Sequence, residues 1–302
     1  IENAAKTVRA GVTTVRDVGG TNNIAVDIRD GIDQGRIPGP RMRASGPLLC
    51  MTGGHGWFAG RMIDSPWEAR KAVRENLWAG ADCIKVVATG GVLTKGAVPG
   101  NAQLLPEELE AAIHEAHRHG LRVASHAIGT EGIKNVLRAG IDSVEHGHML
   151  DDEAIELFKQ HGTYLVPTLT APTCILEHLH DGGQPEFVIR KAQLVGEAMQ
   201  RNIRRAYEAG VKIAGGSDAG TPFNFHENYA YEVELMHTLL GMTPQQALHA
   251  ATAVAADLIG LNRGILAEGE PADLVLFERD VAADIRALRT PLAVVKAGAF
   301  VS

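Results

Sequence analysis

The sequence predicts an α/β barrel of parallel strands, and three features support this prediction. First, a helix ending of small residues and glycine repeatedly runs into a short apolar strand. The glycine suits the left-handed stop after a helix, and an apolar run of this length suits a strand buried on both faces. Second, these strands end on polar, ionisable residues, which meet at the C-terminal mouth of parallel barrels. Third, the pattern recurs along most of the chain, in the segments that begin at residues 10, 79, 119, 139 and 209.

Alternating helix and strand signals define the individual elements. Ser65-Pro66-Trp67-Glu68 and Thr243-Pro244-Gln245-Gln246 are capping-box patterns that begin helices. A (β/α)8 TIM barrel has eight strands, and the sequence shows seven. We expect the first barrel strand to lie upstream of Ile1, because the chain begins with a helix that feeds the first visible strand. The seven expected strands span 13–18, 41–46, 83–89, 122–127, 142–147, 163–168 and 211–217.

The pattern of helix and strand signals changes after about residue 263. Short β-rich runs separated by turn residues replace the long helix–strand alternation. We therefore expect a barrel over 1–263 and a small sheet packed beside it over 264–302. A single doubly wound domain is the alternative.

Composition excludes several classes of function. The formal net charge of −7 without a long basic block argues against nucleic acid as the main partner. The three cysteines form no C-x-x-C pair, which is typical of a reducing compartment. No run of eighteen apolar residues is present, so we expect no membrane span and no membrane partner. We expect a cytoplasmic homo-oligomer; because the chain does not begin with Met, a preceding segment and a lost signal peptide stay open.

Four strand-end residues are candidates for one convergent site. His126 ends the strand in RVASHA and His146 ends the next one in DSVEH, and imidazole is a common zinc ligand. Asp218, in GGSDAGTP, has a carboxylate that can bind a metal and accept a proton from water. Lys85 lies in an apolar strand, where a buried ammonium needs a partner. That lysine is therefore paired with an acidic neighbour, neutral through a lowered pKa, or covalently modified as a carbamate.

Two further histidines have alternative interpretations. His55 lies in the glycine-rich loop TGGHGWF and is either a substrate-binding residue or an ordinary loop histidine. His148 follows His146 in H-G-H and is a rival ligand on the same strand. His146 stands six residues after its preceding glycine, as His126 does, and this equal spacing predicts that these two side chains reach the same layer.

The motifs resemble those of the metal-dependent amidohydrolase superfamily, in the branch of Xaa-Pro dipeptidases (prolidases) and imidazolonepropionase-like enzymes. The matching stretches follow the family order along nearly the whole chain. The family's first-strand H-x-H pair has no counterpart, in agreement with a missing first strand. The matching stretches are GVTTVRDVGG, CIKVVATGG, SHAIGTEGI, DSVEHGHMLDDEAI, YLVPTL, GGSDAGTP, GMTPQQALHAATAVAADLIGL and GILAEGEPADLVLF.

The resemblance implies a (β/α)8 barrel with a small β-sandwich and one or two divalent metal ions, usually zinc. It implies that Lys85 is a carboxylated bridging ligand and that His126 and His146 are the ligands of strands five and six. It implies that Asp218 is both the strand-eight ligand and the general base.

The sequence thus predicts a hydrolase of the metalloprotease type that cleaves an amide bond. The expected substrate is a small molecule, either a dipeptide of the Xaa-Pro kind or an N-acyl amino acid. Three alternatives stay open: hydrolysis of a cyclic amide (imidazolone-type) or a lactone, a Schiff-base lyase that uses Lys85, and a non-catalytic fragment with an incomplete metal site.

Overall fold

A parallel sheet forms the centre of the computed structural model, which describes residues 1–179, 181–261 and 264–301. Seven strands pair in the order β4-β3-β5-β6-β7-β8-β9, and every pairing is parallel. β1 (Thr14–Asp17) and β2 (Arg41–Ala44) form a separate parallel pair. The central strands are β3 (Leu48–Cys50), β4 (Gly60–Met62), β5 (Cys83–Val87), β6 (Arg122–Ala127), β7 (Ser143–His146), β8 (Tyr164–Val166) and β9 (Lys212–Ile213).

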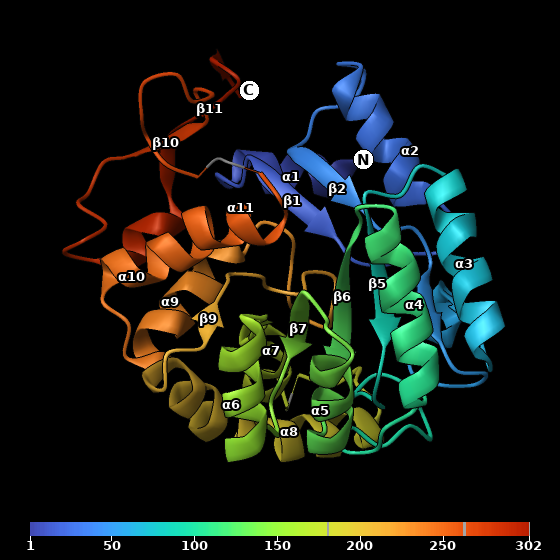
Figure 1. The fold of residues 1–302 in the computed structure, drawn as a ribbon. Coiled ribbons are helices and arrows are strands. Elements are labelled where there is room, and N and C mark those ends of the chain that lie inside the picture. The colour runs from blue at the N-terminus through green and yellow to red at the C-terminus, as the bar shows by residue number, and fades with distance from the viewer. Residues whose placement is uncertain (180, 262–263, 302) are drawn as a thin grey trace.

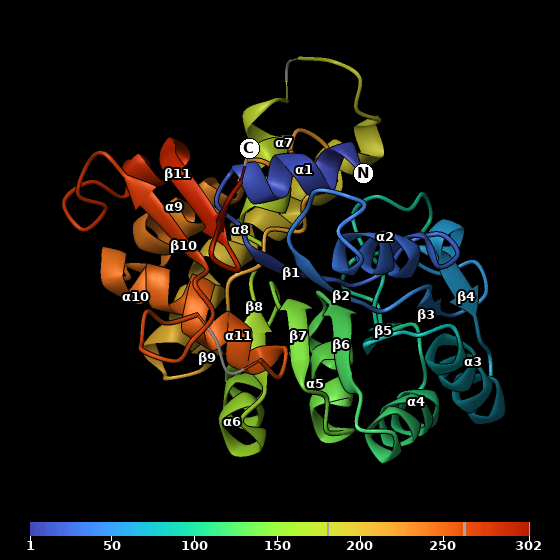
Figure 2. The same ribbon diagram turned by 90° about the horizontal axis from the view of Figure 1, so that it is seen from above.

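Helices follow the strands in sequence and cover the outside of the sheet. α3, α4, α5 and α6 stand side by side along the outer face of β5, β6 and β7, as both views show (Figures 1 and 2). The helices are α1 (Glu2–Arg9), α2 (Ile24–Asp33), α3 (Pro66–Trp78), α4 (Pro106–Arg118), α5 (Thr130–Arg138), α6 (Asp152–His161), α7 (Thr170–Glu177), α8 (Glu186–Glu208), α9 (Tyr229–Leu240), α10 (Pro244–His249) and α11 (Ala255–Leu258). Short 3-10 turns are η1 (Trp57–Ala59) and η3 (Ile285–Arg289), and η2 (Ala250–Val254) is a π-helical turn between α10 and α11.

The core lies between this row of helices and the sheet. Ile84, Val144 and Leu165 are fully buried, as alternate residues of strands covered by helices should be. Capping residues start the helices where the sequence places them. The hydroxyl of Ser65 accepts a hydrogen bond from the backbone N–H of Glu68, and Thr243 and Gln246 cap α10 reciprocally.

All seven predicted strands are present, and the predicted α/β barrel class is confirmed. The structure also contains β3 and β4, which the sequence analysis did not predict. Each has only three residues in the glycine-rich segment around residues 48–62, which is too short to give a recognisable strand pattern. Within the described residues, no backbone pairing joins β9 to β1.

A small antiparallel sheet follows the barrel elements. β10 (Leu274–Phe277), β11 (Pro291–Lys296) and β12 (Ala299–Phe300) pair in that order and stand near α10 and α11, away from the row α3–α6 (Figure 1). The predicted boundary between 1–263 and 264–302 falls beside residues 262–263, which lie outside the described residues, and it stays a prediction. In the described part of the chain, every helix is too short or too polar to cross a membrane.

Candidate active site

One cavity of about 1350 Å³ is lined by all five side chains that the sequence singles out for the site. Lys85 lies on β5, His126 on β6 and His146 at the end of β7. Asp218 follows β9, and His55 lies between β3 and η1. The structure therefore brings the five residues together, and the chemical roles assigned to them stay predictions.

The histidines of the cavity form a row of contacting rings. The ring centroids of His55 and His126 are 4.4 Å apart, and those of His126 and His146 are 4.6 Å apart. His148 extends the row, with its ring 5.6 Å from that of His146. Burial lowers the pKa of His126 and His146 well below the usual value, and it lowers the pKa of His55 to about 4. The four imidazoles are therefore neutral at pH 7, since burial also lowers the pKa of His148 to about 4.

Hydrogen bonds determine which ring nitrogen of each histidine is free. Nε2 of His126 lies 3.1 Å from the carbonyl oxygen of Gly90, which can only accept, so Nε2 carries the proton and Nδ1 the lone pair. The single hydroxyl proton of Thr168 is donated to Pro167 O, so its oxygen accepts from Nδ1 of His146, 2.7 Å away. Nδ1 of His126 and Nε2 of His146 have no hydrogen-bond partner within the described residues. Each ring thus keeps one lone pair available to a ligand.

Equal spacing does not place the two histidines at paired positions of their strands, although their rings meet in the cavity. In the β6–β7 register His126 pairs with Glu145, and His146 pairs with Ala127 one step further along. Successive residues of a strand face opposite sides, so inward-facing Glu145 would direct His146 outward. Instead His146 has a φ of +76°, which ends the strand and allows its ring to enter the cavity.

Left-handed backbone conformations cluster at this site. Thr168 and Asp218, with φ of 48° and 56°, share this feature with His146. They are three of the six non-glycine residues with positive φ in the described part of the chain. Such conformations cost about 1–3 kcal/mol each and persist where the surrounding structure enforces them, often at functional sites.

Lys85 is paired with an acidic neighbour, which is one of the alternatives that the sequence leaves open. Its Nζ donates to Oε2 of Glu145 at 2.6 Å, and both side chains are buried. The other carboxylate oxygen of Glu145 accepts from Nη2 of Arg16 at 3.0 Å. Sequence reasoning missed Glu145, although it follows Ser143 at the period of two that marks one face of a strand.

The backbone around Asp218 is held from two directions. Nδ2 of Asn224 donates to Ser217 O at 2.7 Å and to Asp218 O at 3.0 Å. Upstream, Gly215 N–H donates to Ala250 O at 2.9 Å, at the start of the π-helical turn η2. The deep position raises the pKa of Asp218 by desolvation, while the charge of Lys85 opposes this rise. The side chain itself stays accessible from the cavity.

We expect Gly215→Ala to destabilise the protein by about 1–3 kcal/mol, because the added methyl overpacks a filled site. A Cβ at this position would lie 2.3 Å from the hydroxyl of Tyr229 and 2.9 Å from Cα of Ala251. Urea denaturation measures the effect. Gly20→Ala is the matched control, since nothing lies within 4 Å of its Cβ position. Equal stability of the two variants would contradict the prediction.

His55 is positioned as a hydrogen-bond donor. Its Nδ1 lies 2.9 Å from Oγ1 of Thr94, and that oxygen also accepts from Gly56 N–H. In the tautomer in which the Thr94 hydroxyl donates to Nδ1 of His55, the proton of the neutral ring lies on Nε2. The His55 ring packs directly against the backbone of Gly91. Glycine allows this contact, because a Cβ at position 91 would lie 2.3 Å from the ring.

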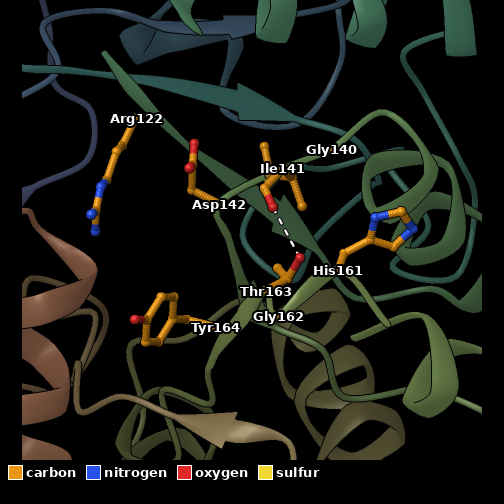
Figure 3. Close-up of a pocket in the computed structure, with 8 residues that line it drawn as sticks. All are labelled: Arg122, Gly140, Ile141, Asp142, His161, Gly162, Thr163 and Tyr164. Carbon is orange, nitrogen blue, oxygen red and sulfur yellow. Dashed lines mark hydrogen bonds between the residues drawn. The ribbon is translucent and has the colours of Figure 1, made fainter. Parts of the chain in front are cut away.

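A second cavity, of about 220 Å³, lies at the opposite ends of the strands (Figure 3). It is lined by the first residues of β6 and β8, Arg122 and Tyr164, and by Asp142 just before β7. Arg122 and Tyr164 both donate to Asp257, and Asp142 accepts from Val123 N–H. These polar groups are already bonded within the fold, so the large cavity is the better candidate for an active site.

The family model described as "Amidohydrolase family" matches residues 2–301 of the chain. The chain belongs to the amidohydrolase family. The predicted resemblance is confirmed, and the match reaches across both the barrel elements and the C-terminal sheet.

Several proteins of known structure are similar to this chain. A Xaa-Pro dipeptidase with methionine bound in its active site is 36% identical, with a TM-score of 0.92 over 99% of this chain and 77% of that one. A prolidase complexed with N-methylphosphonate-L-proline is 29% identical, with a TM-score of 0.92 over 99% of this chain and 78% of that one. An ochratoxinase from Aspergillus niger is 33% identical over 94% of this chain, which spans 63% of that protein's length.

Proposed function

We propose that this chain is a metal-dependent hydrolase that cleaves the amide bond of a Xaa-Pro-like dipeptide or an N-acyl amino acid. Membership of the amidohydrolase family and likeness to a Xaa-Pro dipeptidase and an ochratoxinase support this class of reaction. The observation that carries the proposal is the set of groups facing one cavity: two neutral imidazoles with unshared lone pairs, from His126 and His146, and the carboxylate of Asp218.

The donor set fits a divalent metal ion in its chemistry. Among the described residues, no three His, Cys, Asp or Glu side chains are arranged closely enough to hold an ion together. Neutral imidazole and carboxylate are nonetheless the ligands that zinc prefers, in the protonation states that binding requires. His126, His146 and Asp218 are the residues that would hold one or two zinc ions, and binding would require their side chains to move closer together than they stand in this structure. A bound ion would polarise the scissile carbonyl and make a water molecule more acidic.

Asp218 is suited to move the proton of the reaction. Its carboxylate faces the cavity, and burial raises its pKa, which makes it a better proton acceptor than an ordinary aspartate. Asp218 takes the proton from the attacking water and returns it to the leaving nitrogen as the C–N bond breaks. No second acid is then needed.

His55 is suited to bind the substrate rather than to transfer a proton. With its pKa lowered to about 4, the ring stays neutral, and its Nε2–H can donate to the substrate's carbonyl or carboxylate oxygen. His55 contacts His126 directly, so a substrate bound there lies beside the groups proposed to bind the ion.

Lys85 is proposed to become carboxylated when the ion binds. The ammonium first loses a proton to water, and the free amine nitrogen then adds to the carbon of dissolved CO2. An N–C bond forms as one C–O π bond breaks, and a second proton leaves the nitrogen to water; the carbamate anion replaces an ammonium that an ion would repel. We expect metal-loaded protein in 13C-bicarbonate to show a carbamate resonance by 13C NMR, and Lys85→Arg to lack it. Metal-loaded protein without this resonance would show that Lys85 keeps its pairing with Glu145.

Metal analysis and a substrate panel test the proposal together. Purified protein is loaded with zinc, dialysed and analysed, and then offered Xaa-Pro dipeptides, N-acyl amino acids, cyclic amides and lactones. We expect retained zinc and turnover of an acyclic amide that a chelator abolishes. Preference for a cyclic amide or a lactone would replace the proposed substrate class. A protein that retains no zinc and turns over no substrate would favour the alternative of a non-catalytic fragment. Borohydride trapping of substrate on Lys85 would favour a Schiff-base lyase, although the ion pair with Glu145 disfavours Lys85 as a nucleophile.

A further inference from the structure

Glu232 is a buried carboxylate outside the site described so far. It lies on α9, is fully buried, and forms no salt bridge with a basic side chain in the described part of the chain. Burying such a group is costly unless hydrogen bonds compensate. Burial raises the pKa of Glu232 to about 7, against the effect of its hydrogen-bond donors. Because burying the Glu232 carboxylate costs free energy, the groups that it binds are of interest.

Its partners all belong to the turn that follows β8. Oε1 of Glu232 accepts from Leu169 N–H at 2.9 Å, and Oε2 accepts from Thr170 N–H at 2.8 Å. The hydroxyl of Thr170 donates to the same Oε2. The carboxylate therefore binds the N–H groups of two successive peptide units, one on each side of Leu169 at the start of α7, and fixes their orientation.

The same turn determines the proton positions of both histidines of the H-G-H motif. Oγ1 of Thr168 accepts from Nδ1 of His146, and Pro167 O accepts from Nε2 of His148 at 3.0 Å. Thr168 takes a left-handed φ of 48°, a conformation that neighbouring contacts must enforce. Glu232 binds the backbone of the two residues that follow Thr168, so it is placed to enforce the left-handed conformation of Thr168.

We propose that Glu232 is a positioning residue that, through the Pro167–Thr170 turn, fixes His146 in the tautomer with its proton on Nδ1 and its lone pair on Nε2. This positioning role rests on the proposed function in one respect only: the lone pair on Nε2 is taken to bind the metal ion. Outer groups of this kind typically change metal affinity by ~10–100-fold when they are mutated.

The test reads the tautomer directly in metal-free protein labelled with 15N-histidine, at pH 7.5. The imidazole 15N shifts, assigned with His146→Ala, distinguish a protonated from an unprotonated nitrogen. We expect His146 in the wild type to be protonated on Nδ1 alone. Glu232→Gln brings an amide N–H where the turn needs an acceptor, so we expect mixed tautomers and an apparent zinc affinity ~10–100-fold weaker.

Two further variants make the result specific. Glu234→Gln, on the same helix, removes a buried carboxylate that instead pairs with Arg289 at 2.5 Å, and it should leave the tautomer and zinc affinity unchanged even if it lowers the melting temperature. Thr168→Val removes the acceptor itself with nearly the same shape, and it should reproduce the mixed tautomers even if Glu232→Gln fails to fold.

An unchanged His146 tautomer in Thr168→Val, or in folded Glu232→Gln, would overturn the proposal. So would a tautomer change of equal size in Glu234→Gln. A wild type that binds no zinc but shows the Nδ1–H tautomer, lost in Glu232→Gln, would refute the proposed function and leave the positioning role intact.

Discussion

Asp218→Asn should reduce amide turnover by ~10²–10⁴-fold, the usual worth of general acid–base assistance, and by more where metal binding also weakens. Asparagine keeps the shape and one cavity-facing oxygen but cannot accept the proton of the attacking water. The fold should survive, because the change is nearly isosteric and the backbone is held by Asn224 rather than by the carboxylate. The measurement is kcat on whichever acyclic amide the wild type accepts, with thermal melting recorded alongside.

Asp17→Asn is the matched control for this result. Asp17 also lines the cavity and also has a pKa raised by burial, but its carboxylate accepts from Gly19 N–H and caps a local turn. It should change kcat much less than Asp218→Asn. A loss below ~10-fold for Asp218→Asn, with metal still bound, would assign the base to another residue.

His146→Ala should lose most bound metal, whereas His148→Ala should keep it. Both rings line the cavity. Nε2 of His146 has no hydrogen-bond partner among the described residues, whereas Nε2 of His148 is bonded to Pro167 O and its Nδ1 is fully buried. Zinc content after dialysis, measured by elemental analysis, distinguishes the two variants.

His148→Ala also serves as a control for the loss of a buried ring. It removes a hydrogen bond to Pro167 O and leaves a void, so its melting temperature should fall although zinc is retained. Retention of metal by His146→Ala and loss by His148→Ala would reverse the assignment of the ligand on β7.

Seven strands were predictable because a short apolar run between a helix ending and a polar end is a signal that each segment contains by itself, whereas β3 and β4 lack it. The layer of His146 was not predictable in this way, because register depends on pairing with β6 and on a single left-handed residue. The number of residues between a glycine and a histidine gives the length of the intervening chain, but not the backbone conformation that determines where the histidine side chain points.

The supporting residues of the site were also beyond the sequence. Glu145 is adjacent to a candidate ligand and could have been found from strand alternation, whereas Glu232 is more than eighty positions from His146. Its relation to that ring exists only through the turn after β8, and a lone glutamate in a helix gives no sign of burial. Tertiary contacts, rather than local pattern, define this part of the site.

The left-handed backbone at His146, Thr168 and Asp218 sets a limit on engineering. Glycine tolerates this region without steric cost, and asparagine tolerates it better than most other residues. Directed evolution that rewards heat resistance alone would therefore favour glycine or asparagine at these positions, since relief of local strain raises stability. Each such gain would remove a side chain that faces the cavity or orients one that does. Thermostable variants of this protein are best selected with turnover scored in every round, and with positions 146, 168 and 218 excluded from the library.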